Sequence, residues 1–265
     1  MLMRQISAFL TIAFFCLEVQ AASVSQPPKV INIDGSITNS TLLEVSQKLT
    51  GWQNFDPIPG GLIVLLDSHG GDGEAAMAIG RLLRQKKAQT FVTGQCDSAC
   101  VFILAGGVVR AAKSNTVGVH AGRLTLMDPR GRVVKEIDAT RSLNDSFKLT
   151  SFNSDIRKYF AEMGIEHGLL DLVLAHKTKQ TYQLTDQEMK QYRLIGFDND
   201  YLNERVSVFQ SLPDGERINR IELYNRTLSV PNLCTLNSLN NTGFINCYKA
   251  VLFKAQTKRN TDKFR

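Results

Sequence analysis

The chain has 265 residues, of which 43% are hydrophobic and 21% are charged. This mixture is typical of a folded protein and excludes a disordered chain, and the length allows one large domain or one domain with an appendage. The net charge of +6 permits contact with an anionic partner. However, the sequence contains no basic patch interleaved with aromatic residues, so we expect no nucleic-acid partner.

Residues 1–21 have the form of a secretory signal peptide. Arg4 precedes an apolar run from Ile6 to Leu17, and Val19-Gln20-Ala21 resembles a cleavage site. A membrane anchor is the alternative interpretation, but this run is shorter than the roughly 20 residues that span a bilayer. We therefore predict an exported protein, periplasmic or secreted, from which this segment is removed.

Residues 29–93 predict the beginning of an α/β fold. Alternating apolar residues favour a strand over 29–37, and residues 62–67 form the continuous apolar run typical of a parallel strand buried on both faces. An amphipathic helix follows over 74–84, and a β-type run over 90–93 completes a strand–helix–strand unit.

A glycine-rich turn joins this strand to this helix, with the sequence Ser68-His69-Gly70-Gly71-Asp72-Gly73. The turn matches neither of the glycine patterns that bind nucleotide phosphates, so we expect no nucleotide and no other cofactor. Bare glycines also allow a peptide or acyl substrate to approach the backbone closely. We favour this second use of the turn.

The segment from Gly94 to Gly107 changes from a strand to a helix at Ser98. A serine hydroxyl becomes a strong nucleophile only beside a base and beside backbone N–H groups that hold the developing oxyanion. The start of a helix supplies such N–H groups and the positive end of the helix dipole. Ser98 is therefore a candidate nucleophile. The structural alternative is that it only caps the helix, because serine is a preferred N-cap residue.

The candidate base is His120, at the end of a short strand predicted over 116–122. Among the four histidines, only His120 ends an apolar strand shortly after Ser98. A histidine placed there can accept the serine proton. Two alternatives stay open, because His120 can be purely structural and His69 in the glycine turn is a competing base.

The middle of the chain predicts a hairpin followed by helices. We expect an exposed hairpin over 124–137 and a long helix that ends at Gly164. Thr185 and Glu188 have the spacing of a capping box at the start of a further helix.

The composition of the sequence changes at about residue 201, where asparagines become frequent and prolines such as Pro231 indicate turns. We therefore divide the mature chain into a main domain over residues 29–200 and a C-terminal part over residues 201–265. This C-terminal part is expected to be a small disulfide-closed appendage with a basic tail.

The chain has five cysteines, and Cys16 lies within the signal peptide. The others fit two disulfides in an exported protein, Cys96–Cys100 and Cys234–Cys247. On one helical turn, residues four apart have Cα atoms about 6 Å apart, which a disulfide accepts. The second loop is worth about 3 kcal/mol by loop entropy. The spacing lacks the paired form of zinc sites, so we expect no metal.

Four short motifs follow one another along the chain: Ile31-x-x-Asp34-Gly35-x-Ile37, Leu66-Asp67-Ser68-His69-Gly70-Gly71, Gly94-Gln95-x-x-Ser98 and Val119-His120. Their order resembles that of the Clp protease proteolytic subunit and its relatives in the ClpP/crotonase superfamily, over about residues 29–197. The setting of the serine between two cysteines, after a signal peptide, is similar to that of exported bacterial ClpP-like proteins.

The resemblance implies a spiral of ββα units in which Ser98 is the nucleophile and His120 the general base. It also implies an oxyanion hole at the backbone N–H groups of Gly71 and Ala99. The implied reaction is acyl transfer to water, and the form expected here is hydrolysis of a peptide or protein substrate. ATP is not expected outside the cytoplasm, so we expect no ATPase partner. A homo-oligomer is compatible with the resemblance.

Two positions depart from the family pattern. His69 replaces a proline, and no acid stands near Thr181, where the family's orienting aspartate belongs. Loss of that acid can cost about four powers of ten in rate. The first hypothesis is therefore a serine hydrolase, and the second is a weak or inactive ClpP-fold protein that binds a peptide or a protein partner. A redox role for Cys96 and Cys100 is the third, although their spacing differs from the C-x-x-C of thiol oxidoreductases.

Overall fold

The computed structural model describes residues 27–53, 60–128, 133–137, 142–176, 180–211, 218–234 and 240–253. The predicted signal peptide and basic tail lie outside the described residues. The elements, in chain order, are β1 (Lys29–Ile37), α1 (Asn39–Leu49), β2 (Leu62–Gly71), α2 (Gly73–Gln85), β3 (Gln89–Asp97), α3 (Cys100–Gly106), β4 (Val109–Ala111), β5 (Val117–Val119), β6 (Leu124–Met127), β7 (Val133–Ile137), α4 (Leu143–Glu162), α5 (Gly168–Ala175), β8 (Tyr182–Gln183), α6 (Asp186–Gln191), β9 (Gly196–Phe197), α7 (Asn199–Gln210), α8 (Arg220–Leu233) and α9 (Asn241–Leu252).

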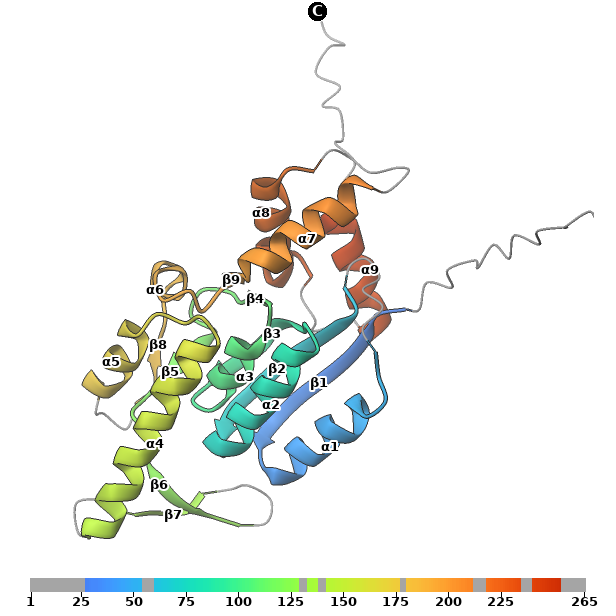
Figure 1. Ribbon diagram of the computed structural model, residues 1–265. Coiled ribbons are helices and arrows are strands. Elements are labelled where there is room, and N and C mark those ends of the chain that lie inside the picture. Colours follow the sequence, from blue (N-terminus) through green and yellow to red (C-terminus); the bar gives the residue numbers. More distant parts are fainter. Residues whose placement is uncertain are drawn as a thin grey trace, which may run out of the picture.

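The described chain is built on a seven-stranded mixed sheet whose main path is β1-β2-β3-β4-β9 (Figure 1). The first four of these strands are parallel, and β9 runs antiparallel to β4. The expected strand–helix–strand unit is present as β2, α2 and β3. The α/β fold class predicted from the sequence is therefore confirmed.

Strand β3 belongs to two parts of the sheet. Its first residues, from Gln89 to Phe91, pair with β4, whereas Cys96 and Asp97 at its end pair with β5. Strand β5 in turn pairs antiparallel with β8. Ser98 therefore follows directly after the part of β3 that is bonded to β5.

The sheet is buried on both faces, as the apolar run in β2 predicts. Leu62, Val64 and Leu66 belong to the hydrophobic cluster that includes residues of α1, α2 and α3. The intervening Ile63 and Leu65 belong to a second cluster with residues of α7, α8 and α9. Successive side chains of a strand point to opposite faces, so each face of β2 has its own core.

The C-terminal helices supply this second core. Phe91 of β3 makes edge-to-face contacts with Phe244 and Tyr248 of α9, with ring centroids 5.5 and 5.1 Å apart. The Tyr248 hydroxyl also donates a hydrogen bond to Oε1 of Gln89, at 2.7 Å. The predicted Cys234–Cys247 disulfide is present and joins the end of α8 to α9. The C-terminal helices thus cover one face of the sheet.

Local sequence signals explain several helix ends. Thr185 and Glu188 form the expected capping box at the start of α6. Helix α4 ends at Glu162, and Gly164 has a φ of +68°, a conformation that glycine adopts without strain. The turn predicted at Pro231 is wrong, because this proline lies inside α8. Pro231 has no N–H to bond the carbonyl of Thr227, four residues earlier, and the helix ends two residues later, at Leu233.

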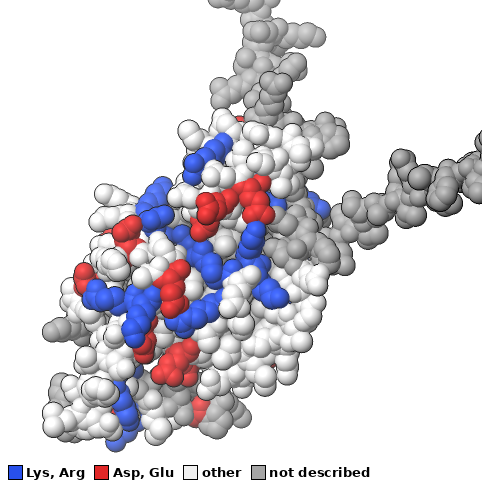
Figure 2. Space-filling model, viewed as in Figure 1, with Lys and Arg blue, Asp and Glu red and all other residues white. Residues whose placement is uncertain are grey.

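Basic and acidic side chains are interleaved on the face shown in Figure 2. Helix α2 is joined to α4 by an ion pair between Arg81 and Glu162, and Lys87 pairs with Glu204 of α7, each at 2.7 Å. These side chains are exposed, so each pair contributes little stability. Within the described ranges, no helix is both long and apolar enough to cross a membrane.

Candidate active site

Ser98 lies in the turn between β3 and α3, with a backbone φ of +56°. This left-handed conformation is uncommon for a residue with a side chain, and such residues cluster at functional sites. The structure also decides against the capping alternative, because the N-cap of α3 is Ala99 and no side chain caps this helix. Ser98 instead lines a cavity of about 510 Å³.

The predicted Cys96–Cys100 disulfide closes the turn that carries Ser98. Cys96 lies in β3 and Cys100 is the first residue of α3, so the bond fixes both ends of the turn. Both cysteines are fully buried. A redox role requires an accessible sulfur, and this disulfide offers none.

The glycines at the end of β2 lie against the serine turn. A Cβ atom on Gly70, which has a φ of +96°, would lie 2.8 Å from Cβ of Ser98 and 3.0 Å from N of Ala99. A Cβ atom on Gly71 would lie 2.2 Å from the carbonyl oxygen of Ile37. The end of β2 can therefore approach the serine turn at Gly70 and β1 at Gly71 only because these residues have no side chains. Gly71 and Ala99, the predicted oxyanion pair, both line the cavity.

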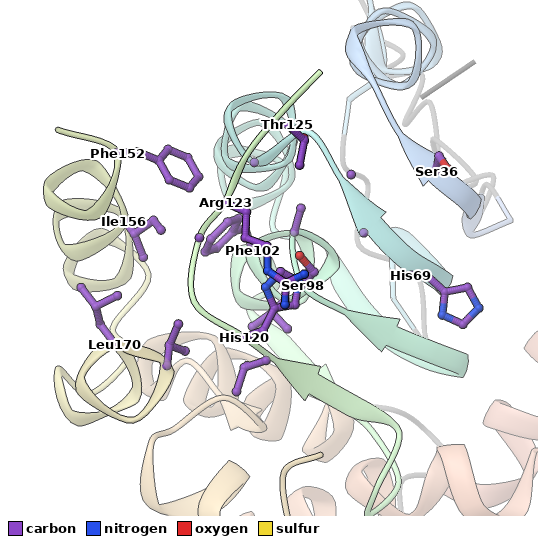
Figure 3. Close-up of a pocket in the computed structure, with 18 of the residues that line it drawn as sticks. Ser36, His69, Ser98, Phe102, His120, Arg123, Thr125, Phe152, Ile156 and Leu170 are labelled. Carbon is purple, nitrogen blue, oxygen red and sulfur yellow. The ribbon is translucent and has the colours of Figure 1, made fainter. Parts of the chain in front are cut away.

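His120 lies on the strand that neighbours the serine turn. Asp97 is paired with Gly118 of β5, and the Ser98 N–H donates a hydrogen bond of 2.8 Å to the Gly118 carbonyl. His120 follows β5 directly, and its side chain lines the same cavity as Ser98 (Figure 3). Within the part of the chain that the structure describes, no hydrogen bond joins Ser98 to His120.

The His120 ring is oriented by a backbone carbonyl. Its Nδ1 lies 2.8 Å from the carbonyl oxygen of Ala121. A carbonyl can only accept a hydrogen bond, so in the neutral ring Nδ1 carries the proton in this contact and Nε2 has the free lone pair. This is the tautomer that a general base needs if Nε2 faces the nucleophile.

No described carboxylate forms a hydrogen bond with His120. Thr181 does lie against the neighbouring strand, because a Cβ atom added to Gly118 would lie 2.4 Å from Cγ2 of Thr181. The position that the resemblance assigns to the orienting acid therefore lies close to β5 but holds a threonine. Glu136 lines the cavity, and its Oε2 lies 3.8 Å from Nη1 of Arg123.

His69, the competing base, points elsewhere. Figure 3 shows its ring projecting from the end of β2 away from Ser98 and His120. Its side chain is 85% exposed, and Nδ1 lies 3.3 Å from Oδ2 of Asp97. The geometry therefore favours His120 over His69 as the partner of Ser98.

One side of the cavity is an apolar wall built by α3, α4 and α5. The sequence predicted a long helix here but did not indicate a cavity beside it. Apolar residues at helical spacing carry no signal of which neighbour they face. The residues of this apolar wall are Phe102, Phe152, Ile156, Phe160, Leu170 and Val173.

The segment that leads into and forms the β6–β7 hairpin adds polar residues to the cavity. Arg123, Thr125 and Glu136 line it together with the apolar wall. The sequence predicted this hairpin as exposed, and none of these three residues was predicted to reach the site. Among the described side chains, no group of three or more His, Cys, Asp or Glu residues is arranged to hold a metal ion.

No protein-family model and no curated protein sequence matches the chain. Among solved structures, the chain is similar to a ClpP1 mutant from Listeria monocytogenes, with 19% sequence identity and a TM-score of 0.45. The match covers 64% of this chain and 92% of that one. The site is therefore interpreted from its own geometry.

Proposed function

We propose that this protein is an exported serine hydrolase that transfers an acyl group through Ser98 to water, most plainly a peptidase that works without ATP. The observation that carries the proposal is the Ser98 turn, which has a positive φ, caps no helix and opens into a cavity shared with His120. A structural serine needs none of these features. The two disulfides are consistent with export.

The proposed first step is attack by Ser98 on the carbonyl carbon of the substrate. Nε2 of His120 takes the proton from Oγ as the new C–O bond forms. The oxyanion then accepts hydrogen bonds from the N–H groups of Gly71 and Ala99. The Ser98–His120 hydrogen bond would form as substrate binds, because catalytic hydrogen bonds are often long before that stage.

The proposed second half returns the proton and releases the acyl group. His120 donates its proton to the leaving nitrogen as the C–N bond breaks, which leaves an ester on Ser98. Water then attacks this ester, His120 accepts the water proton and gives it to Oγ, and the acid is released. Every proton that His120 takes is thus returned within the cycle.

In this proposal the Ala121 carbonyl replaces the orienting acid of a triad. It fixes the tautomer and the direction of the His120 ring. It carries no negative charge, however, so it stabilises the imidazolium less than a carboxylate does. We expect a slower hydrolase than one with a complete triad.

The apolar wall favours substrates with a bulky apolar side chain beside the scissile bond. Burial of such a side chain is worth about 1.5–3 kcal/mol.

The second candidate function is peptide binding without catalysis. It is favoured by the absence, among the described residues, of an acid bonded to His120 and of a Ser98–His120 hydrogen bond.

Labelling of the purified, oxidised protein with a fluorophosphonate tests the proposal. We expect the label on Ser98, no label in Ser98→Ala, and a strong loss of labelling in His120→Ala. His167→Ala is the matched control, because His167 is exposed at the start of α5 and has no proposed role in the site. A folded wild-type protein that stays unlabelled would refute the hydrolase function and favour the binding function.

A further inference from the structure

A second imidazole, that of His69, lies at the rim of the cavity. Its side chain is largely exposed and lines the same cavity as Ser98. In Figure 3 it lies on the opposite side of Ser98 from the labelled residues of the apolar wall. A substrate that crosses Ser98 would therefore meet the apolar wall on one side and His69 on the other.

Asp97 holds the His69 ring in place. Its Oδ2 faces Nδ1 of His69 at 3.3 Å, whereas its Oδ1 accepts hydrogen bonds of 3.1 Å from the side-chain amides of Gln95 and Gln183. Only 13% of the Asp97 side chain is exposed, so the carboxylate is fixed from β3 and from β8. In the neutral ring Nδ1 donates its proton to this carboxylate, which leaves Nε2 as an acceptor.

Two further carboxylates lie on this face of the sheet. Asp67 precedes His69 by two positions and shares its exposed face of β2, and Asp34 of β1 pairs with Asp67 in the strand register. Burial and the nearby Asp67 carboxylate both raise the pKa of Asp34. These surroundings favour a ligand that donates hydrogen bonds or carries positive charge, and they disfavour a carboxylate.

We propose that His69 and Asp97 form a polar subsite for an amine or guanidinium group of the substrate. In a peptide this group would be a lysine or arginine side chain next to the residue that contacts the apolar wall. Nε2 of His69 accepts the hydrogen bond, and the Asp97 carboxylate supplies the negative charge behind the ring. The inference rests on the proposed function for its substrate class, but the binding itself needs no catalysis.

Peptides with one phenylalanine between two identical residues test this subsite. The flanking residue then reaches His69 whichever direction the peptide binds. Peptides flanked by lysine, glutamine or glutamate are compared by fluorescence anisotropy at low ionic strength, in the Ser98→Ala protein. His69→Ala and Asp97→Asn are added to this background, and Asp200→Asn, which removes an exposed carboxylate of α7, is the matched control.

We expect the lysine peptide to bind about fivefold more tightly than the glutamate peptide, which corresponds to one exposed charge pair. His69→Ala and Asp97→Asn should each narrow this difference, because the first removes the hydrogen-bond acceptor and the second removes the charge, and Asp200→Asn should leave it unchanged. Equal affinities in the starting protein, or a difference that neither His69→Ala nor Asp97→Asn reduces, would overturn the inference. His69→Ala alters an exposed side chain, so the result does not depend on whether Asp97→Asn disturbs the fold. Absence of fluorophosphonate labelling would instead refute the hydrolase function, and the binding ratio would still report on the subsite.

Discussion

Removal of each disulfide separately should distinguish a site constraint from a general contribution to stability. The Cys96–Cys100 bond spans four positions and the Cys234–Cys247 bond spans thirteen. Loop entropy then gives a loss of about 2 kcal/mol in unfolding free energy for the first and about 3 kcal/mol for the second. The bond at the serine turn is therefore the weaker one for the stability of the whole protein.

For the reactivity of Ser98, the two disulfides should rank in the opposite order. The Cys96–Cys100 bond closes the turn in which Ser98 has a positive φ, a conformation that costs about 1–3 kcal/mol when nothing enforces it. Without the bond the turn can relax, and a change of about 1.4 kcal/mol in the reactive population is a tenfold change in rate. We expect the Cys96→Ala/Cys100→Ala protein to react with fluorophosphonate about tenfold more slowly.

The assay combines labelling rate with denaturant unfolding for both double-alanine proteins. The Cys234→Ala/Cys247→Ala protein is the matched control, which should lose more unfolding free energy yet keep its labelling rate. Labelling that falls equally in both proteins would show that general destabilisation causes the loss. Unchanged labelling in the Cys96→Ala/Cys100→Ala protein would refute the idea that the bond positions Ser98.

Three further predictions concern other parts of the structure. Gly70→Ala should abolish labelling of Ser98 in a folded protein, because the new Cβ would meet the serine turn; normal labelling kinetics would contradict this. Tyr159→Phe should lower the unfolding free energy by about 1–3 kcal/mol, since it leaves the buried carbonyl of Phe102 without its 2.6 Å hydrogen bond; thermal and urea unfolding would detect this loss. Burial raises the pKa of Glu188, but hydrogen bonds from Thr185 and Tyr182 outweigh burial and hold the pKa below its ordinary value. The contribution of Glu188 to stability is thus present above the ordinary pKa of a glutamate and lost as the pH falls through the lowered pKa, so urea unfolding of Glu188→Gln should show a smaller loss between about pH 6 and pH 3.

The serine turn and the parallel sheet were predictable from sequence because their signals are local. The apolar run of β2 is long enough to require burial on both faces. The Cys96–Cys100 disulfide was also predicted correctly, although Cys96 lies in β3 and not on the helical turn from which its spacing was argued. The strand-to-helix change at Ser98 also depends only on neighbouring residues. The same local signal, however, did not separate a nucleophile from an N-cap, and it was the structure that excluded the cap.

Long-range contacts could not be predicted in this way. Nothing in the sequence of α9 indicates that Phe244 and Tyr248 pack on Phe91 of β3, because apolar residues at helical spacing can face any partner. The orientation of His69 was equally hidden. Its direction depends on Asp97, which is 28 positions away in the sequence and on a different strand.

The division of β3 has a consequence for how this protein can change over time. Gln89 and Phe91 belong to the core under the C-terminal helices, whereas Cys96 and Asp97 support the serine turn. Only the short stretch from Val92 to Gln95 connects these two roles along the strand. Substitutions under α8 and α9 are therefore expected to have little effect on the chemistry proposed for Ser98. Conversely, substitutions that alter the serine turn are expected to leave the core under these helices in place.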